Sequence, residues 1–215
     1  MRKRFLTFGL AAVMALSFTA CGSDNGKKVE SKKTVAKTTE KTTADESKTG
    51  EVVEQDGFKK VPVITDKKLN RKGKTGPIKY NIKAIQVSKL TATTDEMAQA
   101  LDVEKDKEVG LVAMDVEIEN TSDDTINFYF DQGKITTNTK EQVEANLMLS
   151  DSIDGEYLGK VSHKGTLMFI LKNGKADKVN DLKLFVDAPS DKDFNTVGDE
   201  VKIELKFKTF NYYTK

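Results

Sequence analysis

The sequence has 215 residues, of which 35 are Lys or Arg and 34 are Asp or Glu, with one Cys and no Trp. This near-neutral mixture of charges lacks the basic stripe of a nucleic-acid-binding protein, so we expect no nucleic-acid partner. The single Cys excludes a disulfide within the chain, and the fold must therefore depend on an apolar core. A domain of about 150 residues can supply one, because it buries roughly 70% of its unfolded surface.

The N-terminus begins with the cationic residues Arg2, Lys3 and Arg4, followed by the uncharged residues 5–20. As a helix this stretch would span about 24 Å, less than the ~30 Å of a bilayer's hydrocarbon core. A positive start, a short apolar run and small residues at its end are the layout of an export signal. Residues 1–20 are therefore predicted to be a signal peptide.

The apolar run ends at Phe18-Thr19-Ala20-Cys21, which contains the only cysteine. These four residues resemble the lipobox of bacterial lipoproteins, although Phe18 stands where Leu is usual. The resemblance implies that the Cys21 thiol carries a diacylglycerol with fatty acyl chains such as palmitate, and that Cys21 becomes the new N-terminus. Two acyl chains suffice for stable anchoring, which predicts attachment to the extracellular face of the cell membrane. The alternative is a free or buried Cys21 beside an ordinary signal peptide or a single membrane helix.

Residues 21–57 are dominated by Lys, Thr, Ser, Glu and Asp, and the segment between Gly22 and Gly57 has no Phe, Leu, Ile, Tyr or Met. Such a segment cannot bury enough apolar area to offset the entropy lost on ordering. We predict a disordered polar tether with a reach of roughly 30–36 Å. An alternative is that its lysines contact anionic lipid or wall polymer.

Residues 58–215 are predicted to form one folded domain, because short apolar alternations separated by turn residues begin near Phe58. Ile78, Tyr80 and Ile82 share one face of a strand, and the phase then changes to Ile85 and Val87. A change of parity inside one strand predicts a β-bulge.

Further alternations predict more strands, each with its apolar residues two apart. They are Val112, Met114, Val116 and Ile118; then Ile126, Phe128 and Phe130; then Leu182, Leu184 and Val186; and finally Val201, Ile203, Leu205 and Phe207. The run at 167–171, LMFIL, is apolar at every position, as in a strand that is covered on both faces. Seven or more such strands predict an all-β fold, an antiparallel two-sheet sandwich.

One stretch follows a helical rhythm. Thr93 precedes Glu96 by three residues, which predicts a capping box, and Met97, Ala100 and Leu101 would then share one face. We expect this short helix to pack on the outer face of one sheet, near residues 167–171. Alternatively, it lies over a sheet edge elsewhere.

The segments GLVAMDVEIENTSDDTINFYF and GKVSHKGTLMFILKNGKADKVNDLKLFVDAP resemble the immunoglobulin-like domain of Gram-positive surface lipoproteins. That group is related to the mycobacterial immunoprotective extracellular antigen. The shared features are a long strand ending at Asn120-Thr121, an aromatic strand, and two later apolar strands, within roughly residues 76–207. The resemblance implies an immunoglobulin-like fold and a surface location, and it implies no activity.

The sequence offers no set of catalytic residues or ligands for a cofactor. His163, the only histidine, lies in a polar context before a predicted strand, and we interpret it as solvated. Zinc and copper sites need several His, Cys or Met ligands, and the methionines are interpreted as core residues: Met97, Met114, Met148 and Met168. Adjacent Tyr212 and Tyr213 point to opposite faces and do not fit the Tyr-x-x-x-Tyr strand of haem-binding surface domains. We therefore predict neither a catalytic residue nor a cofactor or metal site.

Asp151, Asp154 and Glu156 surround a glycine turn in DSIDGEY, and such carboxylates suit calcium. The spacing is not that of an EF-hand loop, so a solvated turn is the other interpretation. The sequence is compatible with either a calcium ligand set or a solvated turn at these residues.

Two functions fit the sequence. The first is a non-enzymatic β-sandwich module on a lipid-anchored tether, with an envelope or extracellular protein or polymer as its partner. The second is a wall-acting enzyme that uses carboxylates alone, although no spacing selects a pair of them. A pocket with converging Asp or Glu would favour the enzyme, and a shallow surface would favour binding.

Overall fold

The computed structural model describes residues 50–173 and 176–207. The predicted signal peptide 1–20, Cys21 and most of the predicted tether lie outside these residues, as do Tyr212 and Tyr213. No helix in the described part of the chain is long and apolar enough to cross a membrane.

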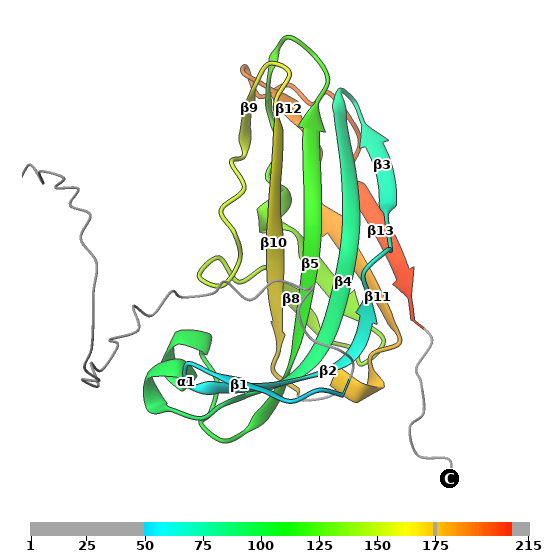
Figure 1. Cartoon of the computed structure of the whole chain (residues 1–215). Coiled ribbons are helices and arrows are strands. Elements are labelled where there is room, and N and C mark those ends of the chain that lie inside the picture. The colour runs from blue at the N-terminus through cyan, green and yellow to red at the C-terminus, as the bar shows by residue number, and fades with distance from the viewer. Residues whose placement is uncertain (1–49, 174–175, 208–215) are drawn as a thin grey trace, which may run out of the picture. The chain divides into compact units, whose positions relative to one another are not determined.

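The first sheet is antiparallel, with the order β1-β2-β4-β5-β10, and β3 also pairs with β4 (Figure 1). Its strands are β1 (Val53–Gln55), β2 (Phe58–Asp66), β3 (Arg71–Thr75), β4 (Ile78–Ala92), β5 (Glu108–Asn120) and β10 (Ser162–Leu171). Strand β1 lies within the range 21–57 that composition assigns to the tether. Because Val53 pairs with Lys60, regular structure begins before Phe58.

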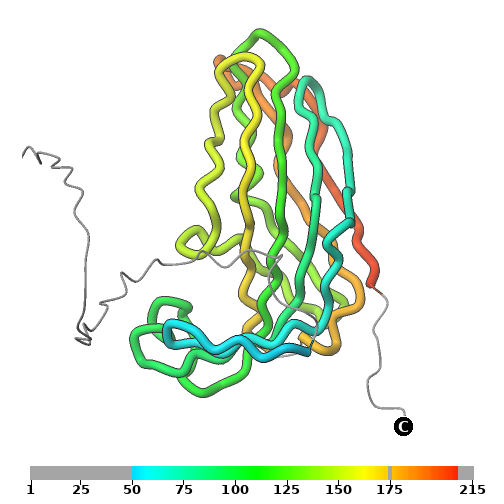
Figure 2. The backbone as a smooth tube through the Cα atoms, in the orientation of Figure 1, coloured from blue at the N-terminus to red at the C-terminus, as the bar shows by residue number. Residues whose placement is uncertain are grey.

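A second sheet has the order β13-β11-β7-β8, and a third, smaller sheet has the order β12-β6-β9. Their strands are β6 (Thr125–Asn127), β7 (Lys134–Thr137), β8 (Gln142–Glu144), β9 (Glu156–Leu158), β11 (Asp181–Val186), β12 (Ser190–Asp191) and β13 (Val201–Lys206). The first and second sheets lie face to face, and the third lies at the end opposite to helix α1 (Asp95–Leu101) (Figures 1 and 2). The predicted all-β antiparallel sandwich with one short helix is confirmed.

The inner core lies between the sheets and collects the inward positions of each strand. Predicted inward residues of four strands are buried in it: Ile78, Ile82, Val112, Met114, Val116, Ile118, Leu182, Leu184, Val186, Val201, Ile203 and Leu205. The alternation of apolar and polar residues therefore predicts both where these strands lie and which of their faces is buried.

Strand β4 contains the predicted bulge. Its pairing with β5 shifts between Ile82 and Ala84, so Lys83 has no partner opposite it. Ile82 before the shift and Ile85 after it are both fully buried in the inner core. The extra residue lets two out-of-phase halves of one strand face the same core.

Helix α1 covers part of the outer face of the first sheet. Its residues Ala98 and Leu101 are buried in a second apolar cluster together with Met168 and Ile170 of β10. Meanwhile Leu167, Phe169 and Leu171 of β10 point into the inner core, so this strand is apolar on both faces as predicted.

The start of α1 differs from the prediction by one residue. Thr94, not Thr93, is the N-cap, and its side chain accepts a hydrogen bond from the Met97 backbone N–H. Met97 therefore occupies the position where a capping box needs Glu or Gln. The shift also moves the buried face, because Ala98 is buried and Ala100 is exposed.

Two other predictions are corrected by the structure. The strand predicted over Ile126, Phe128 and Phe130 ends at Asn127, and a 3₁₀ turn, η1 (Phe130–Gln132), follows. Phe128 and Phe130 are still buried. The two-residue spacing therefore predicted their burial correctly but not their secondary structure. Met148 is 80% exposed in a loop and is not a core residue.

Candidate binding surface on the second sheet

His163 does not lie before a strand as predicted but within β10. Its ring meets the Tyr157 ring edge-on with a centroid distance of 5.0 Å, and its Nδ1 lies 3.8 Å from Oδ2 of Asp154. That separation is too long for a hydrogen bond. Among the described residues, no hydrogen bond joins a Ser or Cys side chain to the His163 imidazole, so this part of the chain offers no nucleophile–base pair here.

The three carboxylates of DSIDGEY do not converge. Asp151 accepts a hydrogen bond from the Thr166 backbone N–H at 2.9 Å, and Glu156 is exposed in β9. Within residues 50–173 and 176–207, no group of three His, Cys, Asp or Glu side chains could hold a metal ion. The position of Asp151 is therefore explained by its contact with β10.

Tyr157 and Asp131 are polar residues at the edge of the inner core. Burial raises the pKa of Tyr157 well above its ordinary range, and the charges of Asp131 and Asp154 raise it further. Burial also raises the pKa of Asp131. The Tyr157 hydroxyl has no hydrogen-bond partner among the described residues, which bury it fully, so its side chain is closed to a substrate.

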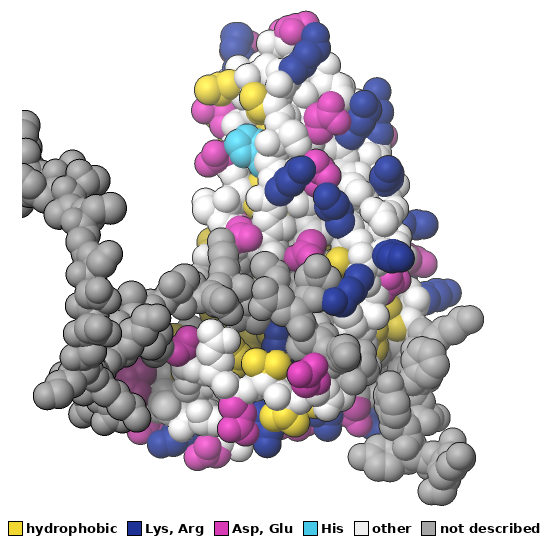
Figure 3. Space-filling model, viewed as in Figure 1, with side chains coloured by type: hydrophobic (Ala, Val, Ile, Leu, Met, Phe, Trp, Pro, Cys, Tyr) yellow, Lys and Arg dark blue, Asp and Glu magenta, His cyan; other side chains and the backbone are white. Residues whose placement is uncertain are grey.

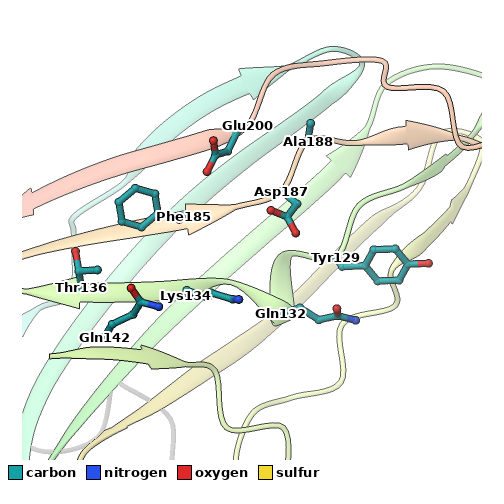
Figure 4. A pocket seen from close by; sticks show the side chains of 9 residues that line it. All are labelled: Tyr129, Gln132, Lys134, Thr136, Gln142, Phe185, Asp187, Ala188 and Glu200. Atoms are coloured by element: carbon teal, nitrogen blue, oxygen red, sulfur yellow. The ribbon is translucent and has the colours of Figure 1, made fainter.

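A shallow depression on the outer face of the second sheet is the candidate binding surface (Figure 4). It has a volume of about 280 Å³ and combines two aromatic rings with amide, hydroxyl, amine and carboxylate groups. The lining residues are Tyr129, Gln132, Lys134, Thr136, Gln142, Phe185, Asp187, Ala188 and Glu200.

Strand alternation places these side chains on the surface. In β11 the inward residues Leu184 and Val186 are buried, so Phe185 between them points outward, and Asp187 follows on the same face. The pairing of Phe185 with Lys134 of β7, and of Phe185 with Lys202 of β13, brings distant segments together. The depression is thus built from the outward positions of strands whose inward positions form the core.

Tyr129 forms one end of the depression, and its side chain is directed away from the sheet in Figure 4. It is 48% exposed. A Cβ at position 155 would lie only 2.2 Å from Cδ1 of Tyr129, so the ring packs directly on the backbone of Gly155. Glycine at 155 therefore allows the ring to lie where it does, with the rest of it available to a ligand.

Four polar side chains in the depression make no hydrogen bond or ion pair within the described chain: Gln132, Gln142, Asp187 and Glu200. The two lysines nearby are engaged. Lys134 forms an ion pair with Glu144 at 3.1 Å, and Lys202 Nζ lies 5.7 Å from the centroid of the Phe185 ring. The depression therefore offers two carboxylates without a cationic partner.

The outer face of the first sheet differs in its charge pairing. There, Lys83 and Lys164 both contact Glu117, at 3.3 and 3.0 Å, and Lys79 lies 4.0 Å from Glu119. Lys and acidic side chains alternate over this face in Figure 3. Glu117 and Glu119 are thus matched by neighbouring lysines, whereas Asp187 and Glu200 form no ion pair with a described residue, which makes the depression on the second sheet the better candidate for a cationic ligand.

None of the residues that line the depression was identified as a site residue from the sequence. Their only signal is that Lys134, Thr136 and Phe185 occupy outward positions of alternating strands. Which outward positions meet depends on the pairing of β7, β8, β11 and β13, and the sequence alone does not give that pairing.

Comparison with known proteins gives a relative in sequence and solved structures of similar fold. No family model matches the chain. The chain is 29% identical over 164 residues to an uncharacterized lipoprotein of Bacillus subtilis strain 168 that is derived from the SPbeta prophage. The aligned region covers 75% of this chain and 72% of that protein. A functionally unknown protein from Listeria monocytogenes has a similar fold, with a TM-score of 0.54 and 13% sequence identity. The superposition covers 69% of this chain and 88% of that protein's chain.

Proposed function

We propose that this chain is a lipid-anchored lipoprotein of the bacterial cell surface whose β-sandwich is a non-enzymatic binding module. The likeness to a Bacillus subtilis lipoprotein supports a bacterial lipoprotein and a place in the cell envelope. The finer points, which are lipidation at Cys21, the extracellular face and the tether, rest on the sequence. The relation to the mycobacterial antigen also stays a prediction, because no comparison bears on it.

The depression on the second sheet is the proposed binding surface. The observation that carries this proposal is the group of four polar side chains, each without a partner among the described residues, around two aromatic rings on a sheet face that is open to solvent. A shallow surface of this kind suits a partner that lies across it, such as an envelope polymer or protein. A small molecule would need a deeper pocket, because such ligands are usually enclosed over most of their surface.

Anchoring is tested by supplying a labelled fatty acid to a Gram-positive host that expresses the full chain. The label should appear on the wild-type chain and be missing from Cys21→Ser. The wild type should also fractionate with the membrane, while the variant should be found in the medium or the wall fraction. Equal labelling of both chains, or no labelling of either, would overturn the anchor.

Binding is tested by sedimenting isolated Gram-positive cell walls with the detergent-solubilised chain. The double variant Asp187→Asn/Glu200→Gln and the single variant Phe185→Ala should remain in the supernatant when the wild type sediments. Glu204→Gln is the matched control, because Glu204 lies on the same sheet face but outside the depression. Loss of sedimentation in the control as well, or in none of the variants, would refute the proposed surface.

A carboxylate-dependent wall enzyme remains the second candidate, because the depression contains two carboxylates that form no ion pair with a described residue, Asp187 and Glu200. Prolonged incubation of cell walls with the full chain distinguishes the two functions. The binding module should release no soluble fragments and no new reducing ends. Release by the wild type that is lost in Asp187→Asn or Glu200→Gln would favour the enzyme.

A further inference from the structure

We infer that the ligand of this depression is a glycan segment that is rich in hydroxyl groups and carries free amino groups. This inference rests on the proposed binding function and adds the chemistry of the ligand. It follows from the charges, the uncharged polar groups and the depth of the depression.

The acidic side chains of the depression indicate that the ligand carries amino groups. On the outer face of the second sheet, Glu144 pairs with Lys134 and Glu204 pairs with Lys183, both at 3.1 Å. Asp187 and Glu200 lie on the same face, and neither forms an ion pair with a described residue. A ligand with ammonium groups would supply the missing partners, whereas a phosphate-rich polymer would be repelled.

Uncharged polar groups indicate the hydroxyls. The side chains of Gln132, Gln142 and Thr136 form no hydrogen bond within the described chain. An amide both donates and accepts hydrogen bonds, and so does a hydroxyl, which makes the two groups complementary in either direction. Tyr129 and Phe185 add aromatic surface for the apolar faces of sugar rings.

Depth and volume indicate a segment of a longer chain. The depression holds about 280 Å³, just under the roughly 300–1,000 Å³ of pockets that enclose a whole drug-sized ligand. It lies on an open sheet, so a polymer can continue past it on either side. A few sugar units would fill it while the rest of the chain stays in solvent.

The test uses three soluble probes: a glucosamine hexamer, an N-acetylglucosamine hexamer and poly(glycerol phosphate). The detergent-solubilised full chain is titrated with each, and binding is followed by calorimetry. Tyrosine fluorescence gives a second readout, because the chain has five Tyr and no Trp. We expect the glucosamine hexamer to bind at least tenfold more tightly than its acetylated form, and the phosphate polymer not to bind.

Variants tie this binding to the depression. Asp187→Asn/Glu200→Gln should lower the affinity for the glucosamine hexamer at least tenfold. Gln132→Ala/Gln142→Ala should lower the affinity for both hexamers. Glu204→Gln and Glu117→Gln, which lie outside the depression, should stay within twofold of the wild type. Because the charged contacts are exposed, added salt should also weaken the binding of the glucosamine hexamer.

The outcomes separate the ligand from the function. Tighter binding of the acetylated hexamer or of the phosphate polymer would overturn the ligand chemistry. Equal loss in Glu117→Gln would also overturn it, because attraction of a polycation to any acidic residue would then explain the result. If cell walls sediment the wild type but not Asp187→Asn/Glu200→Gln, the proposed function holds even where the glucosamine hexamer fails. If walls sediment neither, the function fails too.

Discussion

The two sheets of the sandwich share one core, but their outer faces differ. The outer face of the first sheet is partly covered by α1, and Leu101, Met168 and Ile170 are buried there. The outer face of the second sheet has no such cover among the described residues and carries the polar depression instead. The same architecture thus has one face used for stability and one face left available for a partner.

The difference can be recognised in the strands themselves. In β10 every residue of 167–171 is buried, on both faces. In β13 buried and exposed residues alternate strictly from Val201 to Lys206. A fully buried apolar side chain contributes about 1.5–3 kcal/mol, whereas an exposed ion pair contributes about 0–1 kcal/mol. Substitutions on the open face are therefore tolerated more easily than those under the helix.

The largest effect is expected under the helix. Leu101→Ala removes a side chain that is only 3% exposed and leaves a cavity between α1 and the first sheet. We expect a loss of about 2–5 kcal/mol in the free energy of unfolding. Urea unfolding of the full chain, followed by far-UV circular dichroism, measures it. A loss below about 1 kcal/mol would mean that α1 is only loosely attached.

A smaller effect is expected at the start of the same helix. Thr94→Ala removes the side-chain oxygen that accepts from the Met97 N–H at 3.2 Å. We expect the free energy of unfolding to fall by about 1 kcal/mol. Thr93→Ala should change it little, because Thr93 is exposed and its side chain forms no hydrogen bond with a described residue. The same urea titrations compare the two. A larger loss for Thr93→Ala would contradict the assigned cap.

Asp131 is half-buried at the edge of the inner core, and its substitution should stabilise the protein. Its pKa in the folded state is raised above 3.8, mainly by burial and further by Asp154. The charged form is therefore penalised by folding at neutral pH, and Asp131→Asn should unfold at a higher temperature there. The advantage should shrink as the pH falls through the raised pKa and disappear below about 3.8, where both side chains are neutral. Melting curves at a series of pH values test this, and an advantage that grows toward acid pH would contradict it.

The smallest effect is expected on the open face. Lys183→Ala breaks the exposed ion pair with Glu204, whose atoms lie 3.1 Å apart. We expect a change of at most about 1 kcal/mol in the free energy of unfolding, and less at high salt. Calorimetric melting in low and high salt gives the comparison. A loss as large as that of Leu101→Ala would show that this face also supports the fold.

The fold was predictable from the sequence because its main signals are local. The parity of Ile82 and Ile85 located the bulge, and the unbroken apolar run at 167–171 indicated a strand with cover on both faces. Local signals also set the limits of the prediction. Thr93 and Thr94 are equally suited to cap a helix, and only the backbone geometry shows that Thr94 does so.

The candidate binding surface was not predictable in the same way. Tyr129, Phe185 and Glu200 come from three distant parts of the sequence and meet only because β7 pairs with β11 and β11 pairs with β13. Their residue types alone are ordinary for exposed positions. Neither Asp187 nor Glu200 forms an ion pair within the described chain, although Lys134 lines the same depression, and this is a property of the three-dimensional arrangement.

The bulge in β4 also determines where this strand can change in length. Lys83 is the residue without an opposite partner in β5, and its side chain contributes one exposed ion pair with Glu117. Deleting Lys83 would restore an unbroken inside–outside alternation, with Ile82 and Ile85 both still directed inward. Position 83 is therefore where β4 can lose one residue while its own flanking side chains keep their orientation, with loss of the hydrogen bond that the Lys83 carbonyl accepts from the Asn70 backbone N–H.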